Sequence, residues 1–309
     1  MQKPKIAVLG LFGRSAFLSV DHFHGTGETL HARDLYIEPG GKGYNQAVAA
    51  SRLGGKVTFF GCGGQDDDCD ACTDFLDREG IDHCIQRTPH APTAYACILT
   101  DREGENRVTV FRGAADRFSA DFIRENSNAL AQADLILLNL EYPDAVNEAV
   151  LQIAGAHQIP VVMNPAPAKK IPDGWIPKLR LLTPNRQEAA SLAGVAPDVP
   201  LKALARALNA CGITRAVVTL GADGALLVDG HNLLHFPGIP VKAADTTGAG
   251  DTFNGALAVC LAKGMPLVDC VSYAIHASAL QVQKPFVMPA IPYEETVRSQ
   301  YAVLTPVAL

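Results

Sequence analysis

The residues best suited to chemistry in this sequence stand in the stretch DTTGAGDTFNGA, residues 245–256. Asp251 directly follows Gly248, Ala249 and Gly250, where the spacing of apolar residues predicts a helix over 251–263. Free amides at the positive end of a helix bind anions, and a carboxylate beside them can take a proton from an attacking hydroxyl. Asp251 would then be a general base beside an anion hole. The alternative is that Asp251 only caps the helix.

A second stretch, EPGGKGYNQAVAASRLG at residues 38–54, combines glycines with Lys42 and Asn45. A nucleotide phosphate loop would need Ser or Thr after the lysine, but Gly43 stands there. Two interpretations therefore stay open. Glycines such as Gly41 let the backbone approach a small polar ligand that Lys42 and Asn45 contact, or they only form a turn before a helix.

Two further groups of polar residues follow predicted strands. Asn185 and Glu188, in TPNRQEA, stand three positions apart at a predicted helix start. They suit either Mg²⁺, which takes few protein oxygens and several waters, or a helix-capping pair. Glu141, in NLEYP, either accepts hydrogen bonds from substrate hydroxyls or is a solvated loop residue. The stretch VVTLGADGALL, residues 217–227, predicts a hairpin.

The composition limits the class of protein. The chain has 309 residues, of which 48% are hydrophobic and 19% charged, so we expect a large buried core. The net charge of −6 argues against nucleic acid or an anionic membrane as the main partner. No apolar run has the roughly 20 residues of a membrane span. The eight cysteines show no disulfide framework, and Cys69 and Cys72 lack the second ligand pair of a zinc site. We expect a soluble cytoplasmic protein.

The elements that must position these residues alternate along the chain. Short apolar strands such as KIAVLG, DLILLNL and VVMNP are followed by amphipathic helices, which predicts a doubly wound, mostly parallel sheet covered on both faces. Segments at about 12–37 and 92–112 break this alternation, and we expect them to form a small β-lid on a single domain spanning 1–309. Ligands of open α/β sheets collect at the carboxyl ends of the strands, where the polar residues described above stand.

Together these motifs resemble the ribokinase-like (PfkB) carbohydrate kinases. The resemblance covers essentially the whole chain and depends on GGKGYNQAVAASRLG, NPAPA, TPNRQEA, TLGADGAL and DTTGAGDTFNGAL. It implies a doubly wound α/β domain with a β-lid, often dimeric through that lid. It also implies transfer of the γ-phosphoryl group of ATP to a hydroxyl of a sugar or nucleoside, with Mg²⁺.

The resemblance assigns a role to each candidate residue. Asp251 is implied as the general base and the amides of Gly248, Ala249 and Gly250 as the anion hole. Asn185 and Glu188 are implied to organise magnesium and the phosphates, mainly through water. The nucleotide site is implied to be lined by Thr219, Gly221 and Gly224, and the sugar site by Gly41, Lys42, Asn45 and Glu141.

One departure from the family pattern concerns the acceptor. Family members carry an Asn and an Asp that hold sugar hydroxyls after the first strand, where this sequence has Gly13 and Ser15 flanking Arg14. Without the carboxylate, a plain pentose would lose hydrogen-bond partners. We therefore predict a different or larger polyol, with any anionic group of the acceptor met by Arg14.

A second departure concerns monovalent cations. Asp245 and Thr247 suggest potassium activation by analogy with the family. However, Phe286 and Val287 replace the Gly-Ala pair that helps to surround that cation, so activation by potassium is doubtful.

Two other functions stay open from the sequence. A nucleoside kinase would need a slot for the base, which Phe12, Phe17 or Tyr95 of the lid could build. A non-catalytic sugar- or nucleotide-binding protein of the same fold is the third alternative, although Asp251 and its glycines are intact.

Overall fold

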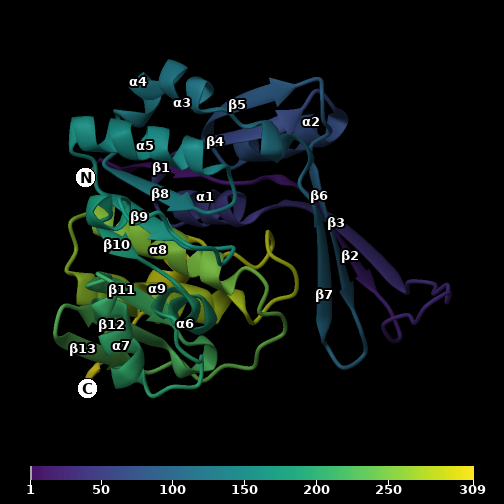
Figure 1. Cartoon of the computed structure of the whole chain (residues 1–309). Helices are drawn as coiled ribbons and strands as arrows, with labels where there is room; N and C mark the ends of the chain where they lie inside the picture. Colours follow the sequence, from purple (N-terminus) through teal and green to yellow (C-terminus); the bar gives the residue numbers. More distant parts are fainter. Residues whose placement is uncertain (1) are drawn as a thin grey trace.

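The computed structural model describes residues 2–309 and divides the strands between two sheets (Figure 1). The larger sheet has ten strands and is parallel from β5 through β11, whereas its last three strands pair antiparallel. The expected mostly parallel sheet is therefore confirmed. In spatial order its strands are β14 (Val307–Ala308), β13 (Asn232–Phe236), β12 (Ala225–Asp229), β11 (Arg215–Thr219), β10 (Leu181–Leu182), β9 (Val161–Asn164), β8 (Leu135–Asn139), β1 (Lys5–Leu9), β4 (Lys56–Gly64) and β5 (Asp82–Thr88).

Helices cover both faces of this sheet because its strands are apolar on both sides. Ile6 and Val8 of β1 belong to one buried cluster, and Ala7 and Leu9 to the other. This alternation follows from the two-residue repeat of a strand. The first cluster includes residues of α1 (Lys42–Arg52), α2 (Asp67–Arg78), α8 (Ala249–Ala262), α9 (Leu267–Gln281) and α10 (Glu294–Gln300); the second includes α3 (Ala120–Glu125), α4 (Ser127–Leu130), α5 (Asp144–His157), α6 (Arg186–Ala193) and α7 (Leu201–Ala210).

The chain changes direction across the sheet between β1 and β8. From β1 it continues to β4 and β5 on one side, and it then returns to β8 and β9 on the other. Such a switch point leaves a crevice at the carboxyl ends of the two strands, where ligands bind in open α/β sheets. The residues that follow β1 and β8 are Gly10–Leu11 and Leu140–Glu141.

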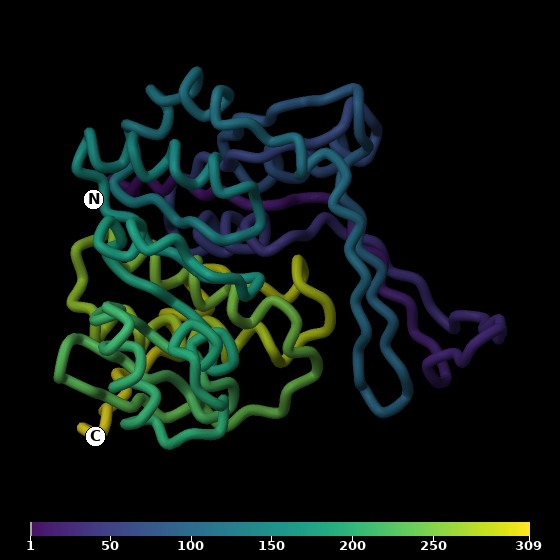
Figure 2. Tube along the Cα trace, in the orientation of Figure 1, coloured from purple at the N-terminus to yellow at the C-terminus, as the bar shows by residue number. Residues whose placement is uncertain are grey.

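The second sheet, which we call the lid sheet, contains β3 (Asp34–Gly40), β2 (Gly13–Ser19), β6 (Ala94–Thr100) and β7 (Asn106–Phe111) in that order. Strand β2 pairs antiparallel with β3 and parallel with β6. The lid sheet extends away from the larger sheet in the trace of Figure 2. It is built from the two segments that interrupt the strand–helix alternation, and the first of them runs to Gly40 rather than 37.

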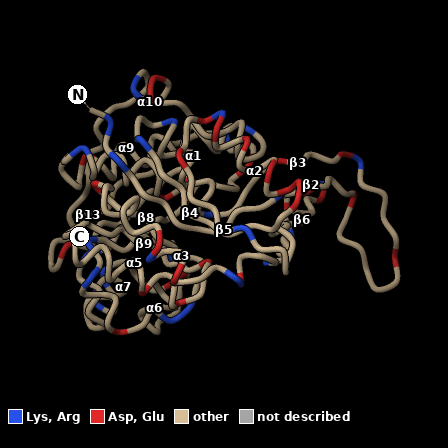
Figure 3. Tube along the Cα trace, turned by 90° about the horizontal axis from the view of Figure 1, so that it is seen from above, with Lys and Arg blue, Asp and Glu red and all other residues tan. Residues whose placement is uncertain are grey.

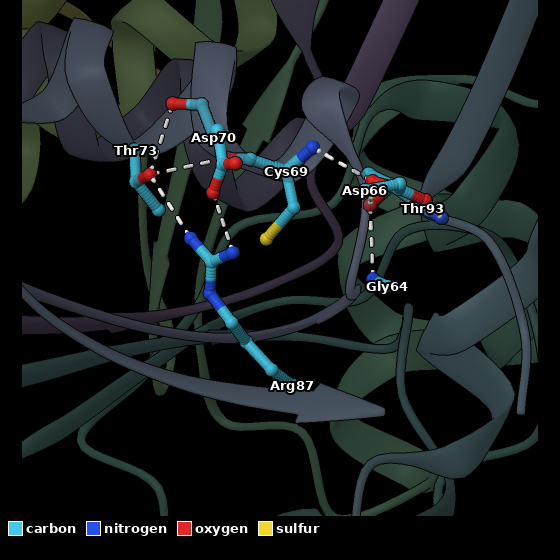
Figure 4. A network of polar contacts seen from close by, with 7 residues as sticks. All are labelled: Gly64, Asp66, Cys69, Asp70, Thr73, Arg87 and Thr93. Atoms are coloured by element: carbon cyan, nitrogen blue, oxygen red, sulfur yellow. Dashed lines mark hydrogen bonds and ion pairs between the residues drawn. The ribbon is translucent and has the colours of Figure 1, made fainter. Parts of the chain in front are cut away.

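A polar network holds the start of β6 against α2 (Figure 4). The Asp66 carboxylate accepts from the amide of Cys69, as an N-cap, and from both the amide and the hydroxyl of Thr93 at 2.9, 2.7 and 2.6 Å. Thr93 Oγ1 in turn accepts from the amide of Gly64 at 2.9 Å. The N-cap of α2 therefore also holds the start of β6, at the base of the lid sheet.

The cysteines are all free, and Cys69 and Cys72 are buried on α2. Within residues 2–309 no group of three or more His, Cys, Asp or Glu side chains is placed to hold a metal ion. The helices in this described part of the chain are too short or too polar to cross a membrane.

Candidate active site

Helix α8 begins at Ala249, two positions earlier than predicted, and Gly248 precedes it with φ 80°. A side chain at Gly248 would also collide with Val287, whose Cγ1 lies 2.7 Å from the Cβ position. Within residues 2–309 the amides of Gly248 and Gly250 find no acceptor, whereas the amide of Ala249 donates to Thr246 O at 3.2 Å. The N-terminus of α8 therefore offers open donors from the two glycines, and Ala249 is engaged in a turn.

Asp251 lies in the first turn of α8 but does not cap it, so the capping alternative is wrong. Its carboxylate accepts hydrogen bonds from Asn45 Nδ2 at 2.8 Å and Gln46 Nε2 at 3.1 Å, both on α1. The side chain is only 8% exposed. Burial raises the pKa of Asp251, against the opposing effects of the Lys42 charge and the two hydrogen bonds.

Only the nitrogen of the Asn45 side-chain amide is hydrogen-bonded among the described residues. Its amide nitrogen is used by Asp251, but Asn45 Oδ1 is buried without a hydrogen-bond partner in the described part of the chain. Buried polar atoms are nearly always satisfied in native structures. A hydroxyl donor is the simplest group that would satisfy this acceptor.

Gln46 and Asn164 are site residues that the sequence analysis missed. Gln46 Nε2 bridges Asp251 and Asn164 Oδ1, the latter at 3.2 Å, and Asn164 Nδ2 donates to Thr183 O at 2.8 Å. This network ties α1, α8 and the end of β9 together. The polar residues beside Asn45 and at the start of NPAPA were the available signal, but neither spacing indicates that they meet.

Glu141 is buried, which excludes the solvated-loop interpretation. Its carboxylate accepts from the amides of Leu11, Gly43 and Lys42 at 2.9, 3.0 and 3.2 Å, at the positive end of α1. Burial raises the pKa of Glu141 to about 7, against the hydrogen bond from Gly43. Gly41, at φ 120°, allows this approach because a side chain there would meet Leu11 O at 2.1 Å.

Lys42 is the first residue of α1, and its side chain is exposed. The negative charge of Asp251 raises the pKa of Lys42, and Glu141 and Glu188 act in the same direction. Lys42 therefore supplies positive charge near these three carboxylates, at the edge of the sheet where the strands end.

Asn185 and Glu188 form a capping box at the start of α6. Asn185 Oδ1 accepts from the Glu188 amide and Glu188 Oε2 accepts from the Asn185 amide, both at 2.8 Å. The capping interpretation is thus confirmed, and the side-chain oxygen of Asn185 is already engaged by the Glu188 amide. Burial raises the pKa of Glu188, whose Oε1 alone remains for a bound water. The pair fits Mg²⁺ through water, with Glu188 as the acceptor, and not as two direct ligands.

The stretch TLGADGALL forms the predicted hairpin of β11 and β12, connected by a short 3₁₀ turn at Gly221–Asp223. Asn185 and Thr219 are joined by an isolated parallel bridge. Gly221 and Gly224 have φ 63° and 90°. The candidate nucleotide residues of this turn therefore lie beside the start of α6.

The side chains of Ser15 and Arg14 lie on opposite faces of the lid sheet. Ser15 pairs with Glu38, which contacts the loop after α9, so their shared face is directed at the larger sheet. Successive strand residues point to opposite faces, and Arg14 Nε lies 3.8 Å from Asp68 Oδ1 of α2. Acidic positions gather where α2 meets β2 and β3 (Figure 3). This geometry does not support the prediction that Arg14 meets an anionic acceptor.

Close packing of two backbones leaves room only for a glycine at Gly13. A side chain at Gly13 would lie 1.9 Å from Ala94 O, because β6 runs directly against this point of β2. No larger residue fits there in this arrangement, which gives a physical reason for the missing Asn.

The three aromatic residues considered for a base slot lie in different surroundings. Phe12 is fully buried and packs against Tyr44 and Phe59 in the core. Tyr95 pairs with Arg14 on the face directed away from Ser15, whereas Phe17 packs against Phe286. Of the three, only Phe17 therefore lies on the lid face that carries Ser15, so a base slot would depend on that residue alone.

The residues considered for a monovalent cation are already hydrogen-bonded. Asp245 Oδ1 accepts from the Thr247 amide at 2.9 Å and Oδ2 from the Phe286 amide at 3.1 Å. The carbonyl of Thr247 accepts from Gln281 Nε2 at 2.7 Å. These oxygens fit a cation poorly, because each already accepts a hydrogen bond.

Known proteins share both the sequence pattern and the fold. The pfkB family carbohydrate kinases match residues 3–292. The chain is 34% identical to the ribokinase of Haemophilus influenzae over 290 residues, covering 93% of this chain and 95% of that one. It is 33% identical to the ribokinase of Staphylococcus aureus over 298 residues, with coverages of 95% and 98%.

Two solved structures extend this similarity. The ribokinase of Thermotoga maritima superimposes with a TM-score of 0.85 at 34% identity, covering 95% of this chain and 98% of that one. The Arabidopsis thaliana ribokinase, solved with ribose and ATP, gives 0.88 at 26% identity, with coverages of 97% and 98%. The ribokinase-like fold is thereby confirmed, and the chain belongs to the PfkB family of carbohydrate kinases.

Proposed function

We propose that this protein transfers the γ-phosphoryl group of ATP to a hydroxyl of a sugar, with Asp251 as the general base. The observation that carries the proposal is the buried Asp251 carboxylate beside the amides of Gly248 and Gly250, which have no acceptor among residues 2–309. The ribose and ATP held by the Arabidopsis relative support this choice of substrates.

In the proposed reaction, a carboxylate oxygen of Asp251 takes the proton of the acceptor hydroxyl. The hydroxyl oxygen then forms a bond to the γ-phosphorus as the bond to the β–γ bridging oxygen breaks, and ADP leaves. The Gly248 and Gly250 amides stabilise negative charge on the transferring group, with Ala249 contributing once its turn contact is released. Lys42 adds positive charge at the same edge. Bound Mg²⁺ supplies charge neutralisation for the phosphates, with Glu188 holding one of its waters.

The acceptor is proposed to bind between the lid sheet and α1. Asn45 Oδ1 is the buried acceptor available to a hydroxyl, and Ser15 supplies the polar group on the lid face. Because Ser15 offers no carboxylate, we expect a polyol other than ribose to be the preferred acceptor. This expectation stands although several relatives are named ribokinase.

A coupled ADP-release assay over pentoses, hexoses, sugar acids and nucleosides tests the proposal. We expect turnover with a sugar, a weaker response to ribose and little response to nucleosides. Ribose as the best substrate with micromolar affinity would refute the acceptor prediction. Tight ATP binding without turnover across the panel would instead indicate a non-catalytic binding protein.

We also propose that two chains pair through the outer face of the lid sheet, the face that carries Arg14. Four large apolar residues are exposed on it, namely Leu35, Ile37, Tyr95 and Phe111. An exposed apolar face of this kind is typical of an interaction site. Sedimentation velocity should give the mass of a dimer, and Phe111→Glu should shift it toward the monomer.

A further inference from the structure

Glu38 is a buried carboxylate that connects the lid sheet to the rest of the molecule. It lies on β3, is 3% exposed, and accepts hydrogen bonds from the amides of Val287 at 2.9 Å and Met288 at 3.0 Å. These amides belong to the loop between α9 and α10. Burial raises the pKa of Glu38 to about 7, against the two hydrogen bonds. A buried charge needs such partners, so this contact is specific and not incidental.

Aromatic residues reinforce the same contact. Tyr36 stands two positions before Glu38 on the same face of β3, and its ring stacks on that of Phe286 with centroids 3.9 Å apart and planes at 25°. The Phe17 ring meets Phe286 edge-on at 5.5 Å. Phe286 has φ 64°, a backbone conformation that bulky residues rarely adopt. We call the contacts of Tyr36 and Glu38 with residues 286–288 the clasp.

The clasp borders the start of α8. The side chain of Val287 covers Gly248, since its Cγ1 lies 2.7 Å from the position a Cβ of Gly248 would take. The amide of Phe286 is held by Asp245, which also accepts from Thr247 in the segment leading into α8. The loop that Glu38 grips is therefore packed directly against the glycine that sets the N-terminus of α8.

The lid end of the clasp borders the proposed acceptor site. Glu38 is the direct cross-strand partner of Ser15, and β3 runs from Glu38 through Gly40 into the start of α1. A displacement of β3 would thus move residues where the acceptor is proposed to bind and, through Val287, residues where the phosphoryl group is proposed to bind.

We propose that Glu38 is a positioning residue that couples the lid sheet to the amides at the N-terminus of α8. The proposal rests on the proposed kinase function and adds to it a physical link between acceptor binding and assembly of the phosphoryl site. Its role is to hold the loop of Val287 and Met288 and not to contact either substrate.

Glu38→Gln tests this role with little change in shape. The glutamine keeps one acceptor oxygen, but its amide nitrogen faces a second N–H donor, so one of the two contacts is lost. We expect kcat to fall at least about tenfold, about 1.4 kcal/mol in the barrier, while the Kd for ATP by calorimetry changes by less than about threefold. Glu105→Gln, in the exposed turn between β6 and β7, is the matched control and should behave as wild type.

Hydrogen exchange over residues 285–290 provides a readout independent of activity. We expect faster exchange of the Val287 and Met288 amides in Glu38→Gln than in wild type or Glu105→Gln. Unchanged exchange would overturn the clasp, and faster exchange with kcat within twofold of wild type would overturn its positioning role. If the wild-type enzyme proves inactive on every acceptor, the proposed function fails, yet the exchange experiment still decides whether the clasp exists.

Val287→Ala covers the case in which Glu38→Gln does not fold. This variant keeps both amides on Glu38 and removes the methyl groups that cover Gly248. We expect a severalfold loss of kcat with unchanged exchange at the clasp. Wild-type kcat in this variant would refute the transmission of position from the loop to α8.

Discussion

Asp251→Asn is the sharpest test of the proposed reaction. The change preserves the shape of the side chain but removes its ability to accept a proton. General-base catalysis typically contributes about 10²- to 10⁴-fold to the rate. We therefore expect kcat to fall by about this factor. At about 1.36 kcal/mol per factor of ten, the activation barrier rises by about 2.7–5.4 kcal/mol.

The structure also predicts that this variant folds. Asp251 accepts one hydrogen bond from Asn45 and one from Gln46, and an asparagine can accept only one of them. The unsatisfied donor costs about 1–3 kcal/mol, but removal of a buried negative charge offsets part of that cost. We expect a loss of at most about 2 kcal/mol in the free energy of unfolding.

The assay combines three measurements on purified protein: coupled ADP release, ATP binding by calorimetry and unfolding in urea. Asp198→Asn, on an exposed loop without side-chain partners in the described residues, is the matched control and should resemble wild type. A folded Asp251→Asn protein that binds ATP normally and keeps kcat within threefold of wild type would remove Asp251 from the mechanism.

Four further perturbations follow from the structure. The Lys42 charge opposes the rise in the pKa of Asp251, so Lys42→Met should raise that pKa further. Because the ionised form of the base is active, the acid limb of the pH profile of kcat/KM should then move to higher pH. Gly250→Ala meets no atom within 4 Å of its new Cβ, so urea unfolding should change by less than about 1 kcal/mol, while kcat falls because the methyl group enters the anion site. Gly248→Ala, at φ 80°, should instead cost about 1–2 kcal/mol of stability, and a stability equal to that of Gly250→Ala would contradict the left-handed geometry. Arg52→Ala removes a buried ion pair of 2.5 Å and two hydrogen bonds to backbone carbonyls, so it should lose about 3–5 kcal/mol of unfolding free energy, and a loss below about 1 kcal/mol would show that the pair is not buried in solution.

The sequence by itself determined the architecture and the centre of the site. Apolar strands alternating with amphipathic helices predicted the doubly wound sheet, and the two interruptions of that alternation became the lid sheet. Local rules also located the glycine turn before α8 and the capping pair at Asn185 and Glu188. These features depend on residues within a few positions of one another, which is why periodicity and spacing reveal them.

The tertiary structure decided which distant residues meet. Asp251 and Asn45 are 206 positions apart and Glu38 and Val287 are 249 apart, so no local spacing relates them. The sequence pattern places Arg14 and Ser15 on opposite faces of a strand, but only the packing of β3 against the loop after α9 fixes which face meets the site. The two-residue repeat of a strand divides its side chains between two faces but does not tell which face is buried. Burial depends on which other elements pack against each face in the folded protein.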